Sequence, residues 1–394
     1  MGKYTSNFER KRNLLLDNAL DKFGKWILLE LPKVIELSGK PYERGYKHGS
    51  ETKELIKKVT NMWFSCLSSI PFPDIALKKG QALSLSSKYL PYAMDYAPDL
   101  VEECRGISDG ANIDFAEIFN LNCFIDILNN IRLQNSIKTW LPQLGCTSFG
   151  VSEKTTKSND NTIIGQNFDL GLDSKVLQEA FIILKAMPEK GPKSICFSIA
   201  GMVGCYGINS SGIALVINKL FSTDSRPGVP YCFIVGKILQ QERVGDAIGS
   251  VINCERASGT HYLLGDKNGD IFGVECTATD YEFLIPLDGV LGHSNHYVSE
   301  KLKPFELYDM NPPSSMVRWI RINKYMNDKK GEITIEDCKN WLKDHVNYPL
   351  SICRHGSEQG QTLSGTIMLP KEMTVLATYG NPCVQSYIEY HVPK

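Results

Sequence analysis

Two neighbouring runs carry the strongest signal in this sequence: Gly145-Cys146-Thr147-Ser148-Phe149-Gly150-Val151 and Ile163-Ile164-Gly165-Gln166-Asn167-Phe168-Asp169. Both are rich in β-branched, aromatic and small residues, and the turn-prone sequence KSNDN lies between them at residues 157–161. We therefore predict a β-hairpin with strands at residues 147–152 and 162–167. This hairpin has a cysteine at the head of one strand and a carboxylate at the end of the returning strand.

The cysteine of this hairpin becomes chemically unusual if the peptide bond between Gly145 and Cys146 is cut. Cys146 then carries a thiol and a free α-amine on adjacent carbons. A thiol with a pKa near about 8.5 is only a few per cent thiolate at neutral pH, whereas an α-amine titrates at about 7.7–8.0 and can accept the thiol proton. Gly145 lacks a Cβ, so its carbonyl is open to attack by the Cys146 sulfur. Self-cleavage would create a nucleophile with its own base; the alternative is an ordinary buried cysteine.

Further motifs, spread over most of the chain, occur in the same order as the sequence motifs of a known family. They are GKPYERGYKHG at residues 39–49, ECRGISDGA at 103–111, GCT at 145–147, QNFD at 166–169, GINSSG at 207–212, HSNH at 293–296 and SMVR at 315–318. In this order they resemble the acyl-coenzyme A:6-aminopenicillanic acid acyltransferase family, also called peptidase family C45, among the N-terminal-nucleophile hydrolases and related to the choloylglycine hydrolases. The resemblance implies a four-layer αββα sandwich and an autocatalytic cut that exposes Cys146.

The periodicity of apolar residues changes near the cysteine. From residue 13 to about residue 130 they recur at helical spacing, for example at residues 14–23 and 55–63. After Cys146 we predict strands at residues 180–186, 194–199, 213–218, 261–264, 271–275, 366–369 and 374–378. We also predict helices at residues 246–253, 314–326 and 335–346, the last opened by a capping box of Thr334 and Asp337.

These patterns predict an α+β fold in two parts. Residues 1–145 form a mainly helical N-terminal segment, and residues 146–394 contain enough strands for two stacked sheets covered by helices. The resemblance makes the second part the αββα catalytic core. It also implies that the two parts are the α and β subunits of a cleaved zymogen, which stay associated with each other.

Composition and charge exclude several classes of partner. Among 394 residues, 42% are hydrophobic and 22% charged, as in an ordinary globular protein. Lys plus Arg number 43 and Asp plus Glu 44, so no basic excess favours nucleic acid or an anionic membrane. No apolar run approaches the roughly 18 residues that span a bilayer, and the polar N-terminus does not resemble a secretory signal. We expect a cytoplasmic protein without nucleic-acid or membrane partners. The MGKYTS sequence at residues 1–6 matches the loose myristoylation pattern, which is often matched by chance.

The twelve cysteines and seven histidines show no metal-binding pattern in the sequence. There is no CxxC pair, and among the histidines only His293 and His296 are close together, without a second group of ligands. Scattered cysteines with apolar neighbours behave as small buried hydrophobes. We apply this interpretation to Cys66, Cys104, Cys123, Cys196, Cys205, Cys232, Cys254, Cys276, Cys338, Cys353 and Cys383. The sequence therefore predicts no metal and no cofactor.

Cys146 and Asp169 are the first two candidate catalytic residues. Cys146 is the candidate nucleophile, attacking an amide or thioester carbonyl to form an acyl-enzyme. Asp169, at the end of the returning strand, is placed to orient the new α-amine by a charge-assisted hydrogen bond. Its alternative role is that of a turn residue at the end of a strand.

Three further candidates follow from the resemblance. Asn295 resembles the family's asparagine that donates a hydrogen bond to the tetrahedral oxyanion, and Asn218 matches the second such amide of the choloylglycine relatives, although either could be a turn residue that satisfies its own backbone. Arg318 matches the active-site arginine, whose charge would lower the thiol pKa and hold the carboxylate. Its rival is Arg321, one helical turn away, and Ser315 is a candidate for substrate contact or simple helix capping.

The sequence thus predicts an autoprocessed cysteine-nucleophile amidohydrolase or acyltransferase. Its substrate would be a small acylated molecule, with an acyl-CoA among the donors that the resemblance implies. Two alternatives remain open: a conventional Cys/His hydrolase with His293 or His296 as base on an uncut chain, and an inactive binding relative.

Overall fold

The computed structural model describes residues 31–70, 76–135, 144–158, 161–286, 288–307, 313–356 and 360–394. The chain divides into two units, Met1–Leu31 and Pro32–Lys394, and the description below concerns the second. The helical periodicity at residues 14–23 and the myristoylation pattern at residues 1–6 lie outside the described residues.

Helices dominate the segment before Cys146. They are α2 (Pro41–Ser68), α3 (Lys79–Ser87), α4 (Leu90–Tyr96), α5 (Pro98–Ala111), α6 (Phe115–Asn122) and α7 (Phe124–Asn135). One strand, β1 (Lys33–Gly39), precedes them, and the sequence analysis did not predict it. Only Ile35 and Leu37 of β1 are buried. Two buried positions give a period of two that is too short to stand out beside a long helical pattern.

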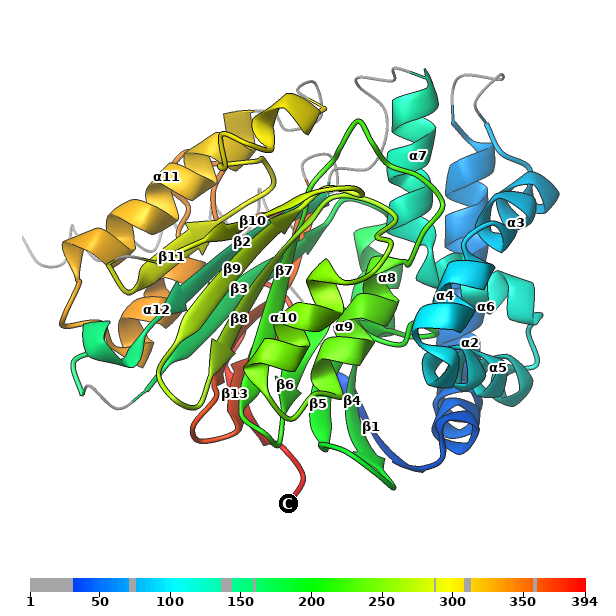
Figure 1. Ribbon diagram of the computed structural model, residues 1–394, viewed down its shortest axis with the longest axis horizontal. Helices are drawn as coiled ribbons and strands as arrows, with labels where there is room; N and C mark the ends of the chain where they lie inside the picture. Colours follow the sequence, from blue (N-terminus) through cyan, green and yellow to red (C-terminus); the bar gives the residue numbers. More distant parts are fainter. Residues whose placement is uncertain are drawn as a thin grey trace, which may run out of the picture. The chain divides into compact units, whose positions relative to one another are not determined.

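Two sheets form the centre of the unit (Figure 1). The eight-stranded sheet has the order β1-β4-β5-β6-β7-β8-β9-β10, and β1 pairs parallel with β4, whereas the other neighbours are antiparallel. Its later strands are β4 (Phe181–Pro188), β5 (Ser194–Ile199), β6 (Tyr206–Asn209), β7 (Ile213–Lys219), β8 (Thr260–Asp266), β9 (Ile271–Cys276) and β10 (Tyr281–Leu284).

The six-stranded sheet contains the predicted hairpin. Its order is β11-β2-β3-β12-β13-β14, with all neighbours antiparallel. The strands are β2 (Leu144–Val151), β3 (Ile163–Leu170), β11 (Val290–His293), β12 (Gln361–Leu369), β13 (Thr374–Ala377) and β14 (Ile388–His391). The pairing of β2 with β3 confirms the hairpin, although residues 159–160 at its tip lie outside the described part of the chain.

Helices cover the outer faces of both sheets and complete four layers (Figure 1). Strands β2 and β3 pack against β7 and β8, so the two sheets face each other. Helices α11 (Pro313–Asp328) and α12 (Ile335–Leu342) pack on the six-stranded sheet. Helices α2 and α9 (Tyr231–Leu239) pack on the eight-stranded sheet, and α10 (Val244–Ile252) lies against α9. The short α8 (Ser174–Ala180) joins β3 to β4. The predicted α+β class and αββα layering are confirmed.

Helix α12 is shorter than the helix predicted at residues 335–346. Its capping box forms as expected, with Asp337 N–H donating to Thr334 Oγ1 at 3.2 Å. The backbone N–H groups of Lys343 and Asp344 bond to carbonyls three residues earlier, a tight last turn that ends the helix. His345 consequently lies beyond the helix, in the connection to β12.

Aromatic side chains fill the space between the sheets. Phe168 of β3 packs with Phe181 of β4 and Tyr206 of β6, with ring centroids 6.3 and 5.5 Å away. Tyr206 and Thr366 of β12 are also hydrogen-bonded across the sheets at 3.1 Å. Each buried aromatic ring removes a large apolar area from water, so this cluster is a major part of the core.

Helices α2 and α5 cross at very short range. A Cβ at Gly45 or Gly49 of α2 would overlap backbone atoms of α5, and a Cβ at Gly106 or Gly110 of α5 would overlap backbone atoms of α2. These glycines belong to the motifs at residues 39–49 and 103–111. The two motifs therefore build a helix–helix contact.

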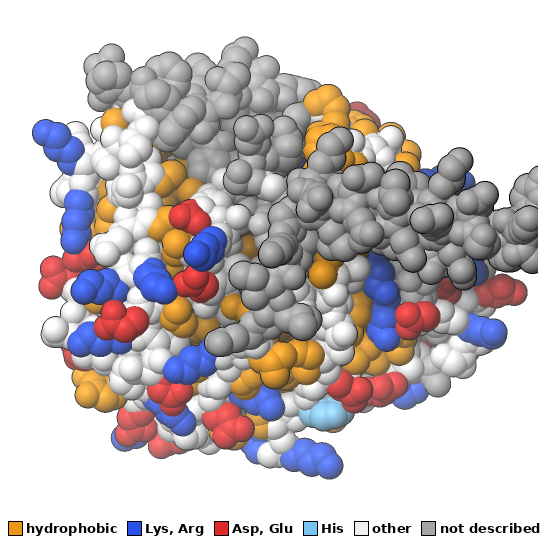
Figure 2. Space-filling model, turned by 180° about the vertical axis from the view of Figure 1, so that it is seen from behind, with side chains coloured by type: hydrophobic (Ala, Val, Ile, Leu, Met, Phe, Trp, Pro, Cys, Tyr) orange, Lys and Arg blue, Asp and Glu red, His pale blue; other side chains and the backbone are white. Residues whose placement is uncertain are grey.

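The surface carries charges of both signs. On the face drawn in Figure 2, acidic and basic side chains are interspersed and do not separate into large patches of one sign. Within the described residues, no helix is both long enough and apolar enough to cross a membrane.

Candidate active site

The β2–β3 hairpin fixes the positions of Cys146 and Asp169. In its register Cys146 lies opposite Phe168, and Gly145 lies opposite Asp169. Ser148 Oγ donates to Asn218 Oδ1 on β7 at 2.5 Å, so Ser148 faces the second sheet. Cys146 is two residues earlier and points to the same face, where it is 5% exposed.

Three of the predicted residues bind the peptide groups of Cys146. Its N–H donates to Asn295 Oδ1 at 2.8 Å. Its carbonyl oxygen accepts from Asn218 Nδ2 at 3.2 Å and from Arg318 Nη1 at 2.5 Å. These side chains come from β7, the segment after β11, and α11, so three distant parts of the sequence converge on one residue.

The orientation of the Asn218 amide follows from its other partners. Asn218 Oδ1 accepts from Ser148 Oγ and lies 3.1 Å from His261 Nδ1. Burial and the neighbouring His293 lower the pKa of His261 well below its usual value, so His261 is neutral and can donate from Nδ1. The amide nitrogen of Asn218 is thereby directed at Cys146.

Asn295 uses its amide differently from an oxyanion donor. Its Oδ1 faces Cys146, while its Nδ2 donates to the carbonyl of Lys219 at 3.1 Å. Its backbone N–H donates to Ser315 Oγ at 2.8 Å. In this uncut chain Asn295 therefore holds the nitrogen of Cys146, and Ser315 holds Asn295.

Arg318 is buried between the cysteine and Asn295. Besides the Cys146 carbonyl, it donates to Thr147 Oγ1 at 3.0 Å and to Asn295 Oδ1 at 2.9 Å. Burial and the nearby Arg354 lower the pKa of Arg318 to about 10, so it is charged at neutral pH. The rival residue, Arg321, instead contacts Asp344 and Tyr325.

Asp169 lies among groups that sequence reasoning missed. Its Oδ1 accepts from Thr362 Oγ1 of β12 at 2.7 Å. Burial raises the pKa of Asp169, while the cations Arg354 and Arg318 oppose that rise. Arg354 also faces Gly145, where any Cβ would overlap its guanidinium. Arg354 follows α12 in a segment without strand or helix periodicity, so no sequence pattern marked it.

The Cys146 thiol is protonated in the uncut chain. Burial and the charge of Asp169 raise the pKa of Cys146 to about 12, against the opposing effects of the Asp169 backbone N–H, Gln166 and Arg318. A nucleophilic role therefore requires a base close to the sulfur.

The two candidate histidine bases have other partners. His293 Nε2 lies 2.6 Å from Glu275 Oε1, and its Nδ1 lies 2.8 Å from the Ser294 carbonyl. His296 Nδ1 lies 2.8 Å from Ser315 Oγ. Both nitrogens of His293 are thus occupied by groups other than the Cys146 thiol.

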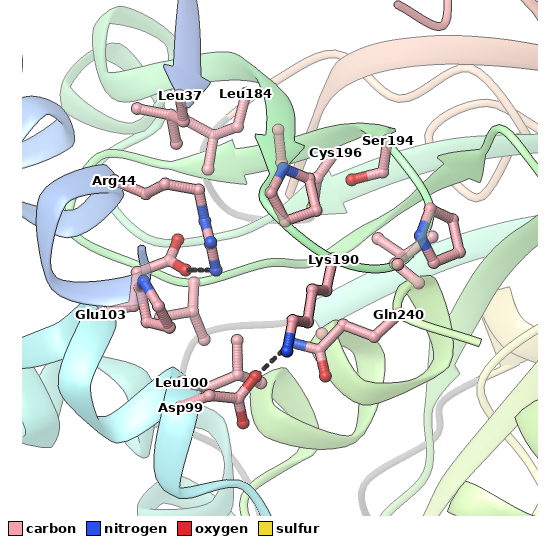
Figure 3. A pocket seen from close by; sticks show the side chains of 18 of the residues that line it. Leu37, Arg44, Asp99, Leu100, Glu103, Leu184, Lys190, Ser194, Cys196 and Gln240 are labelled. Atoms are coloured by element: carbon pink, nitrogen blue, oxygen red, sulfur yellow. Dashed lines mark hydrogen bonds and ion pairs between the residues drawn. The ribbon is translucent and has the colours of Figure 1, made fainter. Parts of the chain in front are cut away.

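A large cavity lies away from this site. It has a volume of about 570 Å³ and is lined by β1, α2, α5, β4 and β5 (Figure 3). Its wall contains the buried ion pair of Arg44 and Glu103, at 2.8 Å, and Gln240 donating to Asp99 at 2.6 Å. Its lining includes none of the predicted catalytic residues.

Comparisons with known proteins agree with the motifs. The family model described as "Acyl-coenzyme A:6-aminopenicillanic acid acyl-transferase" matches residues 155–383, a region that begins after Cys146 and contains the other four candidate catalytic residues. An acyl-coenzyme A:6-aminopenicillanic-acid-acyltransferase, 40 kDa form, of Emericella nidulans is 26% identical over 337 residues, covering 84% of this chain and 87% of that protein.

Two other likenesses are weaker or narrower. An uncharacterized protein of Archaeoglobus fulgidus is 25% identical over 365 residues, covering 80% of this chain but only 58% of that protein. A crystal structure of a mutant conjugated bile acid hydrolase from Clostridium perfringens aligns with 63% of this chain and 97% of that chain, at 12% identity and a TM-score of 0.40. The family model spans more than half of the sequence, and the chain therefore belongs to the acyl-coenzyme A:6-aminopenicillanic acid acyl-transferase family.

Proposed function

We propose that this protein is an autoprocessed enzyme whose nucleophile is Cys146, acting on the amide bond or acyl thioester of a small acylated molecule. The observation that carries the proposal is the convergence of Asn295, Asn218 and Arg318 on the two peptide groups of Cys146. Burial alone requires a hydrogen-bond partner for each peptide group of Cys146, but its carbonyl has two donors, and one of them is the buried cation Arg318.

The first reaction is the cut of the chain itself. The Cys146 sulfur attacks the Gly145 carbonyl carbon, the S–C bond forms, and the C–N bond between the two residues breaks. The thiol proton passes to the departing nitrogen, which becomes the α-amine of Cys146. Water then hydrolyses the Gly145 thioester and releases a carboxylate and the free thiol.

The new α-amine serves as the base for later turnovers. Its nitrogen starts 2.8 Å from Asn295 Oδ1, an acceptor that can hold an ammonium as well as a peptide N–H. Asp169 lies across the strand pair from Gly145 and supplies a negative charge. The amine takes the thiol proton as the sulfur attacks the substrate carbonyl and returns it to the leaving group.

Asn218 and Arg318 are the donors best placed for an oxyanion near Cys146. Both donate to the carbonyl oxygen of Cys146 in the uncut chain, so each must turn an N–H group from that oxygen to serve an oxyanion. Preorganised donors of this kind stabilise charge as it develops in the transition state. We assign Asn295 to holding the amine because its Oδ1 already accepts from the Cys146 N–H, while its Nδ2 donates to the Lys219 carbonyl.

The two fragments stay associated after the cut. Residues 1–145 supply β1, which pairs with β4 over seven residues. They also supply Asp126 of α7, which forms a buried ion pair with Lys219 at 3.3 Å. The resulting α and β subunits share one core.

Hydrolysis and acyl transfer use the same acyl-enzyme. They differ in whether water or an amine attacks it, so the residues around Cys146 serve both. The acyltransferase of Emericella nidulans supports an acyl-CoA as one donor to test. The cytoplasmic location and the absence of nucleic-acid and membrane partners stay predictions of the sequence.

Intact-mass spectrometry of freshly purified protein tests the proposal. Scaling 44.1 kDa by 145/394 and 249/394 gives fragments of roughly 16 and 28 kDa for the wild type, the larger starting with Cys146. Cys146→Ala should stay uncut, and Cys254→Ala, a half-buried cysteine outside the site, should cleave as the wild type does.

Other outcomes would favour the alternatives. A single uncut species in all three samples that still consumes an acyl substrate would favour a conventional Cys/His hydrolase. An uncut and inactive wild type would favour a binding relative.

A further inference from the structure

We propose that His345, Cys353, His355 and Cys383 bind one zinc ion outside the candidate active site. His345 follows α12, Cys353 and His355 lie between α12 and β12, and Cys383 lies between β13 and β14. Their ligand atoms all lie within 4.8 Å of one another. The sequence analysis treated Cys353 and Cys383 as scattered small hydrophobes; Cys353 is buried, but the fold brings the two sulfurs from separate segments to 3.6 Å apart, a proximity that the sequence spacing hides.

The distances within the cluster approach the edges of a zinc tetrahedron. Zinc–sulfur bonds of about 2.3 Å and zinc–nitrogen bonds of about 2.0–2.1 Å give edges of about 3.8 Å between sulfurs, 3.6 Å between sulfur and nitrogen, and 3.3 Å between nitrogens. The two sulfurs are 3.6 Å apart, and His355 Nε2 lies 3.6 Å from Cys353 Sγ and 3.2 Å from Cys383 Sγ. The Nε2 atoms of His345 and His355 are 2.9 Å apart.

The chemistry of the ligands selects zinc over harder cations. Two thiolates and two imidazoles are a common structural zinc set, whereas calcium and magnesium prefer oxygen ligands. Four protein ligands fill a tetrahedron and leave no position for a reacting water, so the expected role is structural.

The surroundings of the cluster support a metal-bound thiolate. Asn381 Nδ2 lies 3.5 Å from Cys353 Sγ, as a donor to the sulfur, and 2.7 Å from the Arg354 carbonyl. Outer donors of this kind orient metal ligands. Cys353 is buried, Cys383 and His355 are half-buried, and His345 is exposed, so an ion can reach the cluster from solvent.

A disulfide is the competing use of the two cysteines. It would require the sulfurs to move from 3.6 Å to about 2.05 Å, and it would leave the convergence of two imidazoles on the sulfurs unexplained. One metal ion would be coordinated by all four side chains.

The cluster also holds the segment that carries Arg354. This residue stands between two of the ligands, and its backbone N–H donates to Thr362 Oγ1 at 3.0 Å. Thr362 in turn donates to Asp169 at 2.7 Å. Arg354 and Thr362 are positioning residues in this arrangement, and zinc keeps their segment against Asp169. The metal site itself does not depend on the proposed cleavage.

Metal analysis of the purified full chain tests the site. After incubation with Zn²⁺ and removal of free ion, the wild type should retain about one zinc per chain. His345→Ala combined with Cys383→Ser should lower this to less than about a tenth. The matched control is His391→Ala combined with Cys254→Ser, which removes an exposed histidine and a half-buried cysteine elsewhere and should retain the zinc.

Two further readouts identify the ligands. The Co²⁺ form of the wild type should show the visible bands of a tetrahedral site and a thiolate-to-cobalt charge-transfer band, both absent in the double variant. Intact mass without reductant should show that the two thiols are free. Equal zinc in wild type and double variant, or a Cys353–Cys383 disulfide in place of metal, would overturn the proposal.

Hydrogen exchange separates this proposal from the proposed function. Removing zinc with a chelator should speed exchange at the amides of Cys353 and Arg354, whose N–H groups are bonded to Asp344 and Thr362. Unchanged exchange would contradict the holding role. A protein that binds zinc but never cleaves would refute the proposed function and leave the metal site standing.

Discussion

The α2–α5 contact and the Cys146 site both bury an arginine near a carboxylate, but they use the charges in opposite ways. Arg44 and Glu103 form a direct ion pair at 2.8 Å, and Arg44 also donates to the Gly39 carbonyl. At the Cys146 site, Arg318 donates to uncharged oxygens, and within the described part of the chain Asp169 Oδ2 has no hydrogen-bond partner.

This difference separates two kinds of motif that look alike in the sequence. Both regions combine glycines with charged residues in an order typical of the family. A closed ion pair beside interlocked glycines stabilises a helix crossing, whereas separated charges around one peptide bond leave polar groups available for chemistry. The following predictions test that distinction.

Loss of the closed ion pair should have the largest effect on stability. Glu103→Gln leaves the Arg44 cation buried without its counter-charge, so the free energy of unfolding should fall by about 3–5 kcal/mol in urea titrations. Glu102→Gln, on the exposed side of the same helix, should change it by less than about 1 kcal/mol. Equal values for the two variants would contradict the assignment of the pair to folding.

Loss of the guanidinium at the Cys146 site should mainly affect rate. Arg318→Lys replaces a planar group with several donors by one ammonium, which cannot serve Cys146, Thr147 and Asn295 together. We expect self-cleavage to slow about 10²–10³-fold in a time course by gel or mass spectrometry. Arg321→Lys should cleave at the wild-type rate; the reverse result would favour the rival arginine.

Two glycine substitutions sharpen the contrast. In Gly106→Ala the new methyl group meets the backbone of α2, which cannot move easily, so we expect a stability loss of about 1–3 kcal/mol with normal cleavage by the folded protein. In Gly145→Ala the methyl group meets the Arg354 side chain, and cleavage should slow more than stability falls. Urea titrations and cleavage assays of both variants check this. If the two variants lose stability and cleavage rate in the same proportion, the distinction between a folding motif and a catalytic motif fails.

The last prediction concerns the pH dependence of stability in the helical region, where the effect is spread over several pH units. Burial lowers the pKa of His48 to about 3, and its Nε2 accepts from the Gly201 N–H at 3.1 Å. Between pH 6.5 and 3 the unfolded chain binds a proton that the folded chain does not. The contribution of His48 to the free energy of unfolding is complete above pH 6.5. Between pH 6.5 and 3 it falls by about 1.4 kcal/mol for each pH unit of acidification. His48→Gln should flatten the measured curve relative to the wild type, whereas a change at the exposed His391 should not.

Much of the fold followed from local sequence patterns. The hairpin at Cys146, the strands β5 and β7 and the capping box at Thr334 formed where periodicity and turn residues predicted them. Strands β6, β10, β11 and β14 were missed because each has only four residues and, unlike the equally short β13, none opens with two β-branched residues. Pairing with neighbouring strands forms them: β10, β11 and β14 pair at the sheet edges with β9, β2 and β13, and β6 pairs between β5 and β7.

Prediction of the candidate site was limited in the same way, because local sequence patterns do not reveal contacts that form only in the fold. Cys146, Asp169, Asn218, Asn295 and Arg318 were named from motifs, and the structure brings them to one place, while their catalytic roles stay predictions. Thr362 was missed because it reaches Asp169 only through the pairing of β12 with β3, and Arg354, whose charge acts on Asp169, lies in the segment before β12. The sulfur atoms of Cys353 and Cys383 also come together only in the fold, across 30 residues of sequence.

The parallel pairing of β1 with β4 has a consequence for how the protein could be made. Once the chain is cut, the smaller fragment is a donor that completes the edge of its partner's sheet, as a separate peptide could. The two fragments expressed as independent chains should therefore find each other during refolding, and the larger one should expose an unpaired strand edge until they do. In the proposed function, the peptide bond before Cys146 keeps the two halves together during synthesis, and the pairing of β1 with β4 then helps to hold them after the cut.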